Sequence, residues 1–139
     1  MLSSLQEKGY CVIPNVLTSS EITQCKESFA HWQSTIHNHN NMHGIYKYHR
    51  SGHTWHSWFI RTRPSIQEVF KTIYECDDLI VSFDGCCYIS KNSNKKDTCW
   101  THTDQAPNTK GFQCYQGLVS LTDNKERTLV VYEGTHKMH

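Results

Sequence analysis

A histidine and an aspartate stand two positions apart in the short stretch TCWTHTDQAP, residues 98–107. The stretch has strand-like character, and the side chains at positions i and i+2 of a strand project from the same face. The imidazole of His102 and the carboxylate of Asp104 are therefore predicted to converge on one point. Together with a second histidine, such a pair forms the facial triad that holds non-haem Fe(II). The triplet is also common by chance, so spacing alone favours a surface pair without a metal.

Length and composition indicate the kind of domain that must position this pair. The chain has 139 residues, which suits a single domain over 1–139. Because this length is short for a large β-barrel enzyme, we expect the domain to be incomplete. Only 37% of the residues are hydrophobic, and the four Trp, seven Tyr and five Phe supply much of the material for burial. The core is expected to be small and rich in aromatic rings.

Charge, hydropathy and cysteine spacing indicate which partners and which compartment to expect. Lys and Arg number 14 and Asp and Glu 13, so the net charge of +1 favours neither nucleic acid nor an anionic membrane as partner. No stretch approaches the roughly 20 apolar residues of a membrane span, and the first residues do not resemble a signal peptide. The seven cysteines form no C-x-x-C pair, which favours buried free thiols in a reducing compartment over disulfides or a zinc ribbon. We therefore expect a cytoplasmic protein.

Two helices are predicted in the N-terminal half, after a short strand at GYCVIP, residues 9–14. Thr18 and Glu21 form a capping box at the start of the first helix, whose apolar face runs to Trp32. Ser65 and Glu68 form a second capping box, and apolar residues over 66–74 predict the second helix. The segment between them is polar and histidine-rich, and it predicts a loop that ends in a strand-like aromatic patch.

Strands are predicted in the C-terminal half, where short apolar runs alternate with turn residues. These runs cover residues 79–84, 86–90, 100–105, 112–121 and 128–132. Such spacing is typical of an antiparallel sandwich or barrel rather than of alternating strands and helices.

The order of several motifs resembles the phytanoyl-CoA dioxygenase family of Fe(II)/2-oxoglutarate-dependent oxygenases. The motifs are GYCVIPNVLTSSEI, WHSWFIRTRPSIQEVF, LIVSFDG, HTDQ, GFQCYQGLVSLTD and LVVYEGTHK, and they extend over residues 9 to 137. The most specific parts are the H-x-D-Q segment and the G-T-H-K segment.

The resemblance implies a mainly β fold with N-terminal helices: a double-stranded β-helix, or jelly roll, with the metal at its mouth. It implies Fe(II) held by His102 and Asp104, 2-oxoglutarate as co-substrate, and hydroxylation of an unactivated C–H bond in a small-molecule substrate, with release of succinate and CO2. Gln116 is carried over as a residue of the co-substrate pocket, although a polar residue bonded within a sheet explains it equally well. Gln105 is expected to point away from the ligands and to support the site only indirectly.

Two departures from the family pattern stand against an active enzyme. The third ligand, a later histidine, and the arginine that binds 2-oxoglutarate would follow His139, so the last strands of the barrel are expected to be missing. The family's Asp-Gly-Gly turn is replaced by Glu126, Arg127 and Thr128. The alternative is therefore a catalytically dead remnant that serves as a binding or scaffold module, with a partner chain completing the barrel.

Two further groups of residues invite a binding role. The histidines at positions 31, 37, 39, 43, 49, 53 and 56 include short pairs that suit zinc, but solvated histidines in a loop are favoured. The aromatic and basic residues of TWHSWFIRTRP, 54–64, either wrap the edge of a core, which is favoured, or stack on a flat ligand at a substrate entrance.

Overall fold

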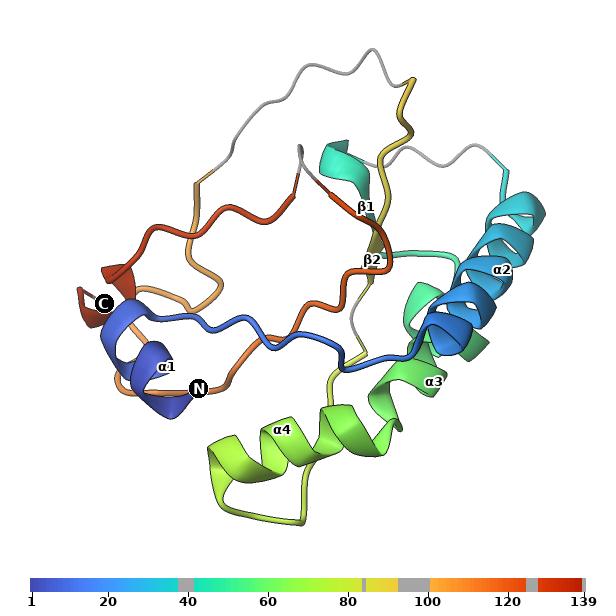
Figure 1. The fold of residues 1–139 in the computed structure, drawn as a ribbon. Helices are drawn as coiled ribbons and strands as arrows, with labels where there is room; N and C mark the ends of the chain where they lie inside the picture. Colours follow the sequence, from blue (N-terminus) through green and yellow to red (C-terminus); the bar gives the residue numbers. More distant parts are fainter. Residues whose placement is uncertain (38–41, 84, 93–100, 125–127, 139) are drawn as a thin grey trace. The chain divides into compact units, whose positions relative to one another are not determined.

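The computed structural model describes residues 1–37, 42–83, 85–92, 101–124 and 128–138 (Figure 1). The α-helices among them are α1 (Leu2–Lys8), α2 (Ser19–Thr35), α3 (Trp55–Arg61) and α4 (Pro64–Tyr74). Three 3₁₀ turns, η1 (Met42–Gly44), η2 (Ser51–His53) and η3 (Thr135–Lys137), and two strands, β1 (Ile45–Tyr46) and β2 (Cys86–Cys87), complete the described elements. The chain forms two compact units, one of Met1–Ile13 with Lys95–His139 and the other of Pro14–Asn94.

The expectation of a mainly β jelly roll is wrong for the described residues. They are 41% helical and 3% strand. Their sheet is one antiparallel pair, in which Ile45 faces Cys87 and Tyr46 faces Cys86. The predicted strands over 9–14, 79–83, 101–105, 112–121 and 128–132 belong to no ladder here, and the ends of two predicted runs, at 84 and 100, lie outside the described residues. A strand needs a partner backbone as well as apolar side chains, and short apolar runs do not specify that partner.

Helix α2 begins where its capping box predicts. The Glu21 backbone N–H donates to the Thr18 hydroxyl at 3.2 Å, and the Thr18 N–H donates to Glu21 Oε2 at 2.8 Å. These two bonds satisfy N–H groups that a helix start leaves without intrahelical partners. The first predicted helix is confirmed.

The end of the histidine-rich segment is helix α3, so the strand-like patch predicted there is wrong. Its residues WHSWFIR do not alternate regularly between apolar and polar, and an aromatic pair at helical spacing favours the helix over their β propensity. Trp55 stacks on Phe59, four residues later, with 4.5 Å between ring centroids. Figure 1 shows α3 lying beside α2 in the unit that also contains α4.

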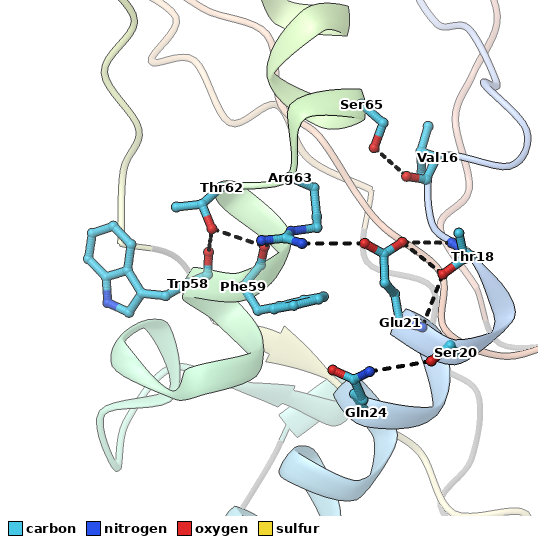
Figure 2. Close-up of polar contacts among 10 residues, drawn as sticks. All are labelled: Val16, Thr18, Ser20, Glu21, Gln24, Trp58, Phe59, Thr62, Arg63 and Ser65. Atoms are coloured by element: carbon cyan, nitrogen blue, oxygen red, sulfur yellow. Dashed lines mark hydrogen bonds and ion pairs between the residues drawn. The ribbon is translucent and has the colours of Figure 1, made fainter.

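Helix α4 begins earlier than predicted. Pro64 occupies its first turn and Arg63 is its N-cap, because proline has no N–H to lose there and its φ already suits a helix. The Ser65 hydroxyl, predicted as the cap, donates instead to the carbonyl of Val16 (Figure 2). The second helix is confirmed, with its cap corrected.

The core of the described part of the Pro14–Asn94 unit is small, as the composition predicts, with Leu17, Cys25, Tyr46 and Ile66 as its buried hydrophobic residues. Tyr46 is the aromatic ring among them, so the expectation of a core rich in aromatic rings holds only in part. The half-buried Phe29 of α2 packs beside it, with ring centroids 6.3 Å from Tyr46, 5.6 Å from Trp32 and 5.3 Å from the exposed Tyr88. Cys25 is fully buried on the same helix. Edge-on and tilted ring contacts of this kind add to the free energy of burial.

In the unit that contains both termini, α1 contacts the chain near η3. Helix α1 ends at Gly9, whose φ of +87° is left-handed. The Gly134 N–H donates to the Lys8 carbonyl at 2.8 Å, and His136 Nε2 lies 3.0 Å from the Gln6 carbonyl. None of the helices in the described ranges is long and apolar enough to cross a membrane.

Candidate functional site

His102 and Asp104 lie together in the structure. His102 Nε2 is 3.1 Å from Asp104 Oδ1, within hydrogen-bonding distance. The histidine side chain is 44% exposed and the aspartate side chain 65%, so both stay in contact with water. An exposed pair of this kind adds little to stability. Its side chains are accessible to a solute.

The backbone around the pair is not the predicted strand. Residues 101–103 belong to no element, and the chain bends at 104–105. The Thr103 hydroxyl donates to the Gln105 carbonyl at 3.1 Å and supports this bend. The Thr101 hydroxyl lies 3.3 Å from the Tyr132 hydroxyl, which links the residue before His102 to the 128–132 segment. His102 and Asp104 therefore lie close together in a segment that is supported by local side-chain hydrogen bonds and not by a sheet.

Gln105 holds the loop that follows the pair. Its amide nitrogen donates to the Thr109 carbonyl at 2.9 Å and to the Gly111 carbonyl at 2.8 Å. The Thr109 N–H also closes a turn onto the Ala106 carbonyl at 3.0 Å. Through these two bonds Gln105 holds the loop backbone, and its indirect support of His102 and Asp104 stays a prediction. The Pro and Gly in APNTKG signal the turn, but the sequence does not identify Gln105 as its clamp.

The separation of the two polar atoms suits a shared metal ion. Two neighbouring positions on an octahedral ion with bonds of about 2.1 Å lie about 3.0 Å apart. The distance from His102 Nε2 to Asp104 Oδ1 is 3.1 Å. The chemistry also fits, since an imidazole nitrogen and a carboxylate oxygen are two of the three donors in the facial triad of non-haem iron.

The described residues contain no group of three or more His, Cys, Asp or Glu side chains that could hold a metal ion. A metal ion at the pair would therefore find two protein donors, His102 and Asp104, among the described residues. Gln116, predicted to line a co-substrate pocket, is exposed in the 112–121 segment, and no hydrogen bond joins it to the pair in this part of the chain. Of the replaced turn residues, Glu126 and Arg127 lie outside the described residues.

His56 is the buried exception among the histidines predicted to be solvated. It is 3% exposed, with Nδ1 3.2 Å from the Ser28 hydroxyl and Nε2 2.9 Å from the Thr54 hydroxyl. Burial lowers the pKa of its imidazole below the usual 6.5. Nδ1 joins α3 to α2 through Ser28, whereas Nε2 contacts Thr54 at the N-cap of α3 itself, and these contacts identify His56 as a structural residue. His39 lies outside the described residues.

The cysteines follow the predicted burial only in part. Cys25 is buried, Cys11 and Cys86 are half-buried, and Cys76, Cys87 and Cys114 are exposed, while Cys99 lies outside the described residues. Burial raises the pKa of Cys86 to about 11 and also raises the pKa of Cys25 and Cys87. These three thiols are protonated at neutral pH, and a protonated thiol is a poor nucleophile and metal ligand.

Comparison with known proteins gives one partial match. The chain is 33% identical over 78 residues to the Ava biosynthesis cluster protein O of Aspergillus versicolor. The match covers 55% of this chain and 25% of the relative, so the chain spans about a quarter of the length of that protein. No protein-family model matches the sequence, and no solved structure matches it.

Proposed function

We propose that this chain contributes His102 and Asp104 as two ligands of a non-haem Fe(II) site, of the kind used by 2-oxoglutarate-dependent oxygenases of the phytanoyl-CoA dioxygenase type. The observation that carries the proposal is the 3.1 Å separation of His102 Nε2 and Asp104 Oδ1. It suits neighbouring positions on one ion, and the two donor types suit Fe(II). The proposal rests on the pair and the motif order, and does not depend on a jelly roll.

Each ligand has a distinct part in this site. The Asp104 carboxylate offsets positive charge on the ion, and neutral His102 donates a nitrogen lone pair. The Thr103 hydroxyl and the Gln105 amide bind backbone carbonyls at 105 and 109 and so support the backbone next to the two donors. Bound Fe(II) with 2-oxoglutarate supplies the oxidising chemistry for hydroxylation of a small molecule. The remaining coordination positions fall to the co-substrate, to solvent, or to a residue beyond the described pair.

The name of the partial relative is consistent with such chemistry. That protein is named for a biosynthesis cluster. We propose a small organic molecule as the substrate of the present chain, because hydroxylation modifies molecules of that class. The compound itself is left open by this proposal.

Anaerobic titration with Fe(II) and 2-oxoglutarate tests the proposal. A chelate on the protein-bound ion gives a weak visible charge-transfer band, and we expect this band with the wild-type chain and its loss in His102→Ala and Asp104→Ala. His136→Ala is the matched control, since His136 is exposed and contacts Gln6 in the same unit. A band that survives both ligand substitutions, or no band at saturating ligand, contradicts the proposal.

A binding or scaffold module is the second candidate, and exposed apolar side chains favour it. Leu129, Val130 and Val131 follow one another in the chain. They are 60%, 65% and 46% exposed, respectively. Adjacent apolar residues left in water mark interaction sites. Two results together would favour this candidate. The chain would bind no Fe(II), and a partner would protect the backbone amides of segment 128–132 from hydrogen exchange.

A further inference from the structure

The imidazole of His56 lies buried at the contact between α3 and α2. Its ring meets those of Phe29 and Trp32 on α2 edge-on, with centroids 5.6 Å and 6.0 Å away. Nδ1 lies 3.2 Å from the Ser28 hydroxyl of α2, and Nε2 lies 2.9 Å from the hydroxyl of Thr54, the N-cap of α3. One titratable ring thus sits where two helices of the Pro14–Asn94 unit meet.

The hydroxyl groups around the ring indicate where its proton lies. The Ser57 hydroxyl donates to the Ser51 carbonyl at 2.8 Å, and the Thr54 hydroxyl has that carbonyl and the Ser57 oxygen as acceptors, both at 2.9 Å. The Thr54 oxygen can then accept from Nε2–H of His56, while Nδ1 accepts from the Ser28 hydroxyl. This arrangement gives both ring nitrogens a partner while the ring stays neutral.

A second proton on the ring would disturb this arrangement. Nδ1–H would have to donate to the Ser28 oxygen, so the Ser28 hydroxyl would have to turn its own hydrogen elsewhere. The ring is 3% exposed, and a charge in such a place costs free energy unless an opposite charge lies beside it. Burial is what lowers the pKa of the imidazole below its usual 6.5, and no charged neighbour in the described part of the chain offsets it.

The titratable groups on the surrounding elements are engaged elsewhere or exposed. Those on α2, η2, α3 and α4 are Glu21, paired with Arg63; Lys71, paired with Asp77; Arg61, bonded to the Gly52 carbonyl; Cys25, buried; and the exposed Lys26, Glu27, His31, His53, Glu68 and Tyr74. A protonated His56 therefore finds no counter-charge among them.

Helix α3 is the element most easily released by such a charge. It has seven residues and no side-chain cap at its N-terminus. Helix α2 has 17 residues and a capping box, and α4 has 11 residues with a proline in its first turn. A helix as short as α3 depends on tertiary packing for its stability, so it opens before the longer helices do.

We propose that His56 is a pH-sensitive switch: the neutral ring holds α3 against α2, and a second proton on the ring releases α3 while α2 and α4 stay folded. Release uncovers the face of Phe29 that meets the imidazole and leaves an apolar surface on α2 in contact with water. The proposal is independent of the iron site, because it concerns the other unit of the chain.

Hydrogen exchange of the whole chain at pH 7.5 and pH 5.5 tests this proposal. Protection factors are compared, because they exclude the intrinsic pH dependence of exchange. The amides of Trp58 and Thr62 report on α3, since they donate to the carbonyls of Thr54 and Trp58. We expect their protection to fall several-fold at pH 5.5, up to about tenfold for one imidazole, while that of α4 stays constant. Unchanged protection of α3, or an equal loss in α2, α3 and α4, overturns the proposal.

Three variants assign the effect to His56, with circular dichroism at pH 7.5 to check that each keeps its helices. In His56→Phe the protection of α3 should be the same at both pH values. Ser28→Ala keeps the ring but removes the donor to Nδ1, so α3 should open at a higher pH than in the wild type. His31→Phe, at an exposed position on α2, should open as the wild type does.

A loss of protection that persists in His56→Phe overturns the proposal. Should His56→Phe fail to fold, Ser28→Ala decides, because it retains the imidazole: opening at the same pH as in the wild type would then overturn the proposal.

Discussion

The guanidinium of Arg63 lies over the ring of Phe59, with 4.0 Å between Cζ and the ring centroid. The same guanidinium reaches Glu21 Oε1, 3.4 Å from Nη1, and donates through Nε to the Phe59 carbonyl at 3.2 Å (Figure 2). Arg63 is the N-cap of α4, whereas Glu21 closes the capping box of α2. One side chain thus joins the starts of two helices and the end of α3.

Replacing Arg63 with lysine should destabilise this junction although the charge is kept. A lysine ammonium lacks the flat face that covers Phe59 and the fork that reaches two acceptors. We expect a loss of about 1 kcal/mol in the free energy of unfolding, measured by urea denaturation. Arg50→Lys is the control, because Arg50 is exposed, and it should cost far less. Equal losses in the two variants would show that the stacking contributes nothing.

Acid should weaken the same junction through Glu21. The hydrogen bond from the Thr18 backbone N–H, followed by the Thr18 hydroxyl and Arg63, holds the pKa of the Glu21 carboxyl below its usual 4.5. Since the folded pKa is lowered, this contribution is present above pH 4.5 and is lost as the pH falls through the folded value. Glu21→Gln should therefore flatten the stability profile below pH 4.5. Glu27→Gln, at an exposed site on the same helix, should leave that profile as in the wild type.

His56 should add a second pH dependence at higher pH. Burial lowers the pKa of His56 below 6.5, so the unfolded chain takes up a proton there before the folded chain does. Stability therefore falls as the pH decreases below about 6.5. Urea denaturation at pH 7.5 and pH 5.5 should show this loss in the wild type and a smaller difference in His56→Phe. The His31→Phe variant, at an exposed position, should lose as much stability between the two pH values as the wild type. If His56→Phe also lost as much as the wild type, the pH dependence would come from another group.

Gly9 should resist substitution more strongly than Gly111. Both have left-handed φ values, +87° and +77°, so alanine should cost about 1–2 kcal/mol of strain at each. A Cβ at Gly9 would also clash with His136 Nδ1, whereas a Cβ at Gly111 would meet none of the described residues within 4 Å. Gly9→Ala should therefore lower the free energy of unfolding by about 1 kcal/mol more than Gly111→Ala does, because His136 must give up its contact with the Gln6 carbonyl. In a His136→Ala background the two alanine variants should cost the same, and an undiminished difference there would exclude the His136 contact as its cause.

Helices α2 and α4 were predictable from the sequence because their signals are local, whereas α1 was not predicted. The Thr18–Glu21 capping box and the apolar face that includes Cys25 lie within a few residues of each other and suffice to place α2. Helix α3 was missed because its residues Trp55 to Arg61 are rich in aromatic side chains, whose intrinsic preference is for strands. Its packing against α2 through the buried His56 is a tertiary contact that the local pattern does not contain.

The candidate site was predictable in one respect and not in others. The i, i+2 spacing correctly places His102 beside Asp104, although a supported bend and not a strand brings them together. Gln105 clamps backbone carbonyls four and six residues away, and such bonds depend on the loop conformation that the sequence leaves open. The jelly-roll prediction failed because it required pairing between distant apolar segments, which composition and spacing do not specify.

Paramagnetic NMR with Mn(II) tests the central claim most directly, because an ion of this kind broadens only the signals of nearby nuclei. Mn(II), an oxygen- and nitrogen-binding stand-in for Fe(II), is added in small amounts to the isotopically labelled chain. We predict that the signals of His102 and Asp104 broaden first, that their neighbours follow, and that Asp104→Asn abolishes the effect. Broadening that begins among the histidines of residues 31–56, or that persists unchanged in Asp104→Asn, would contradict the assignment of these two residues as metal ligands.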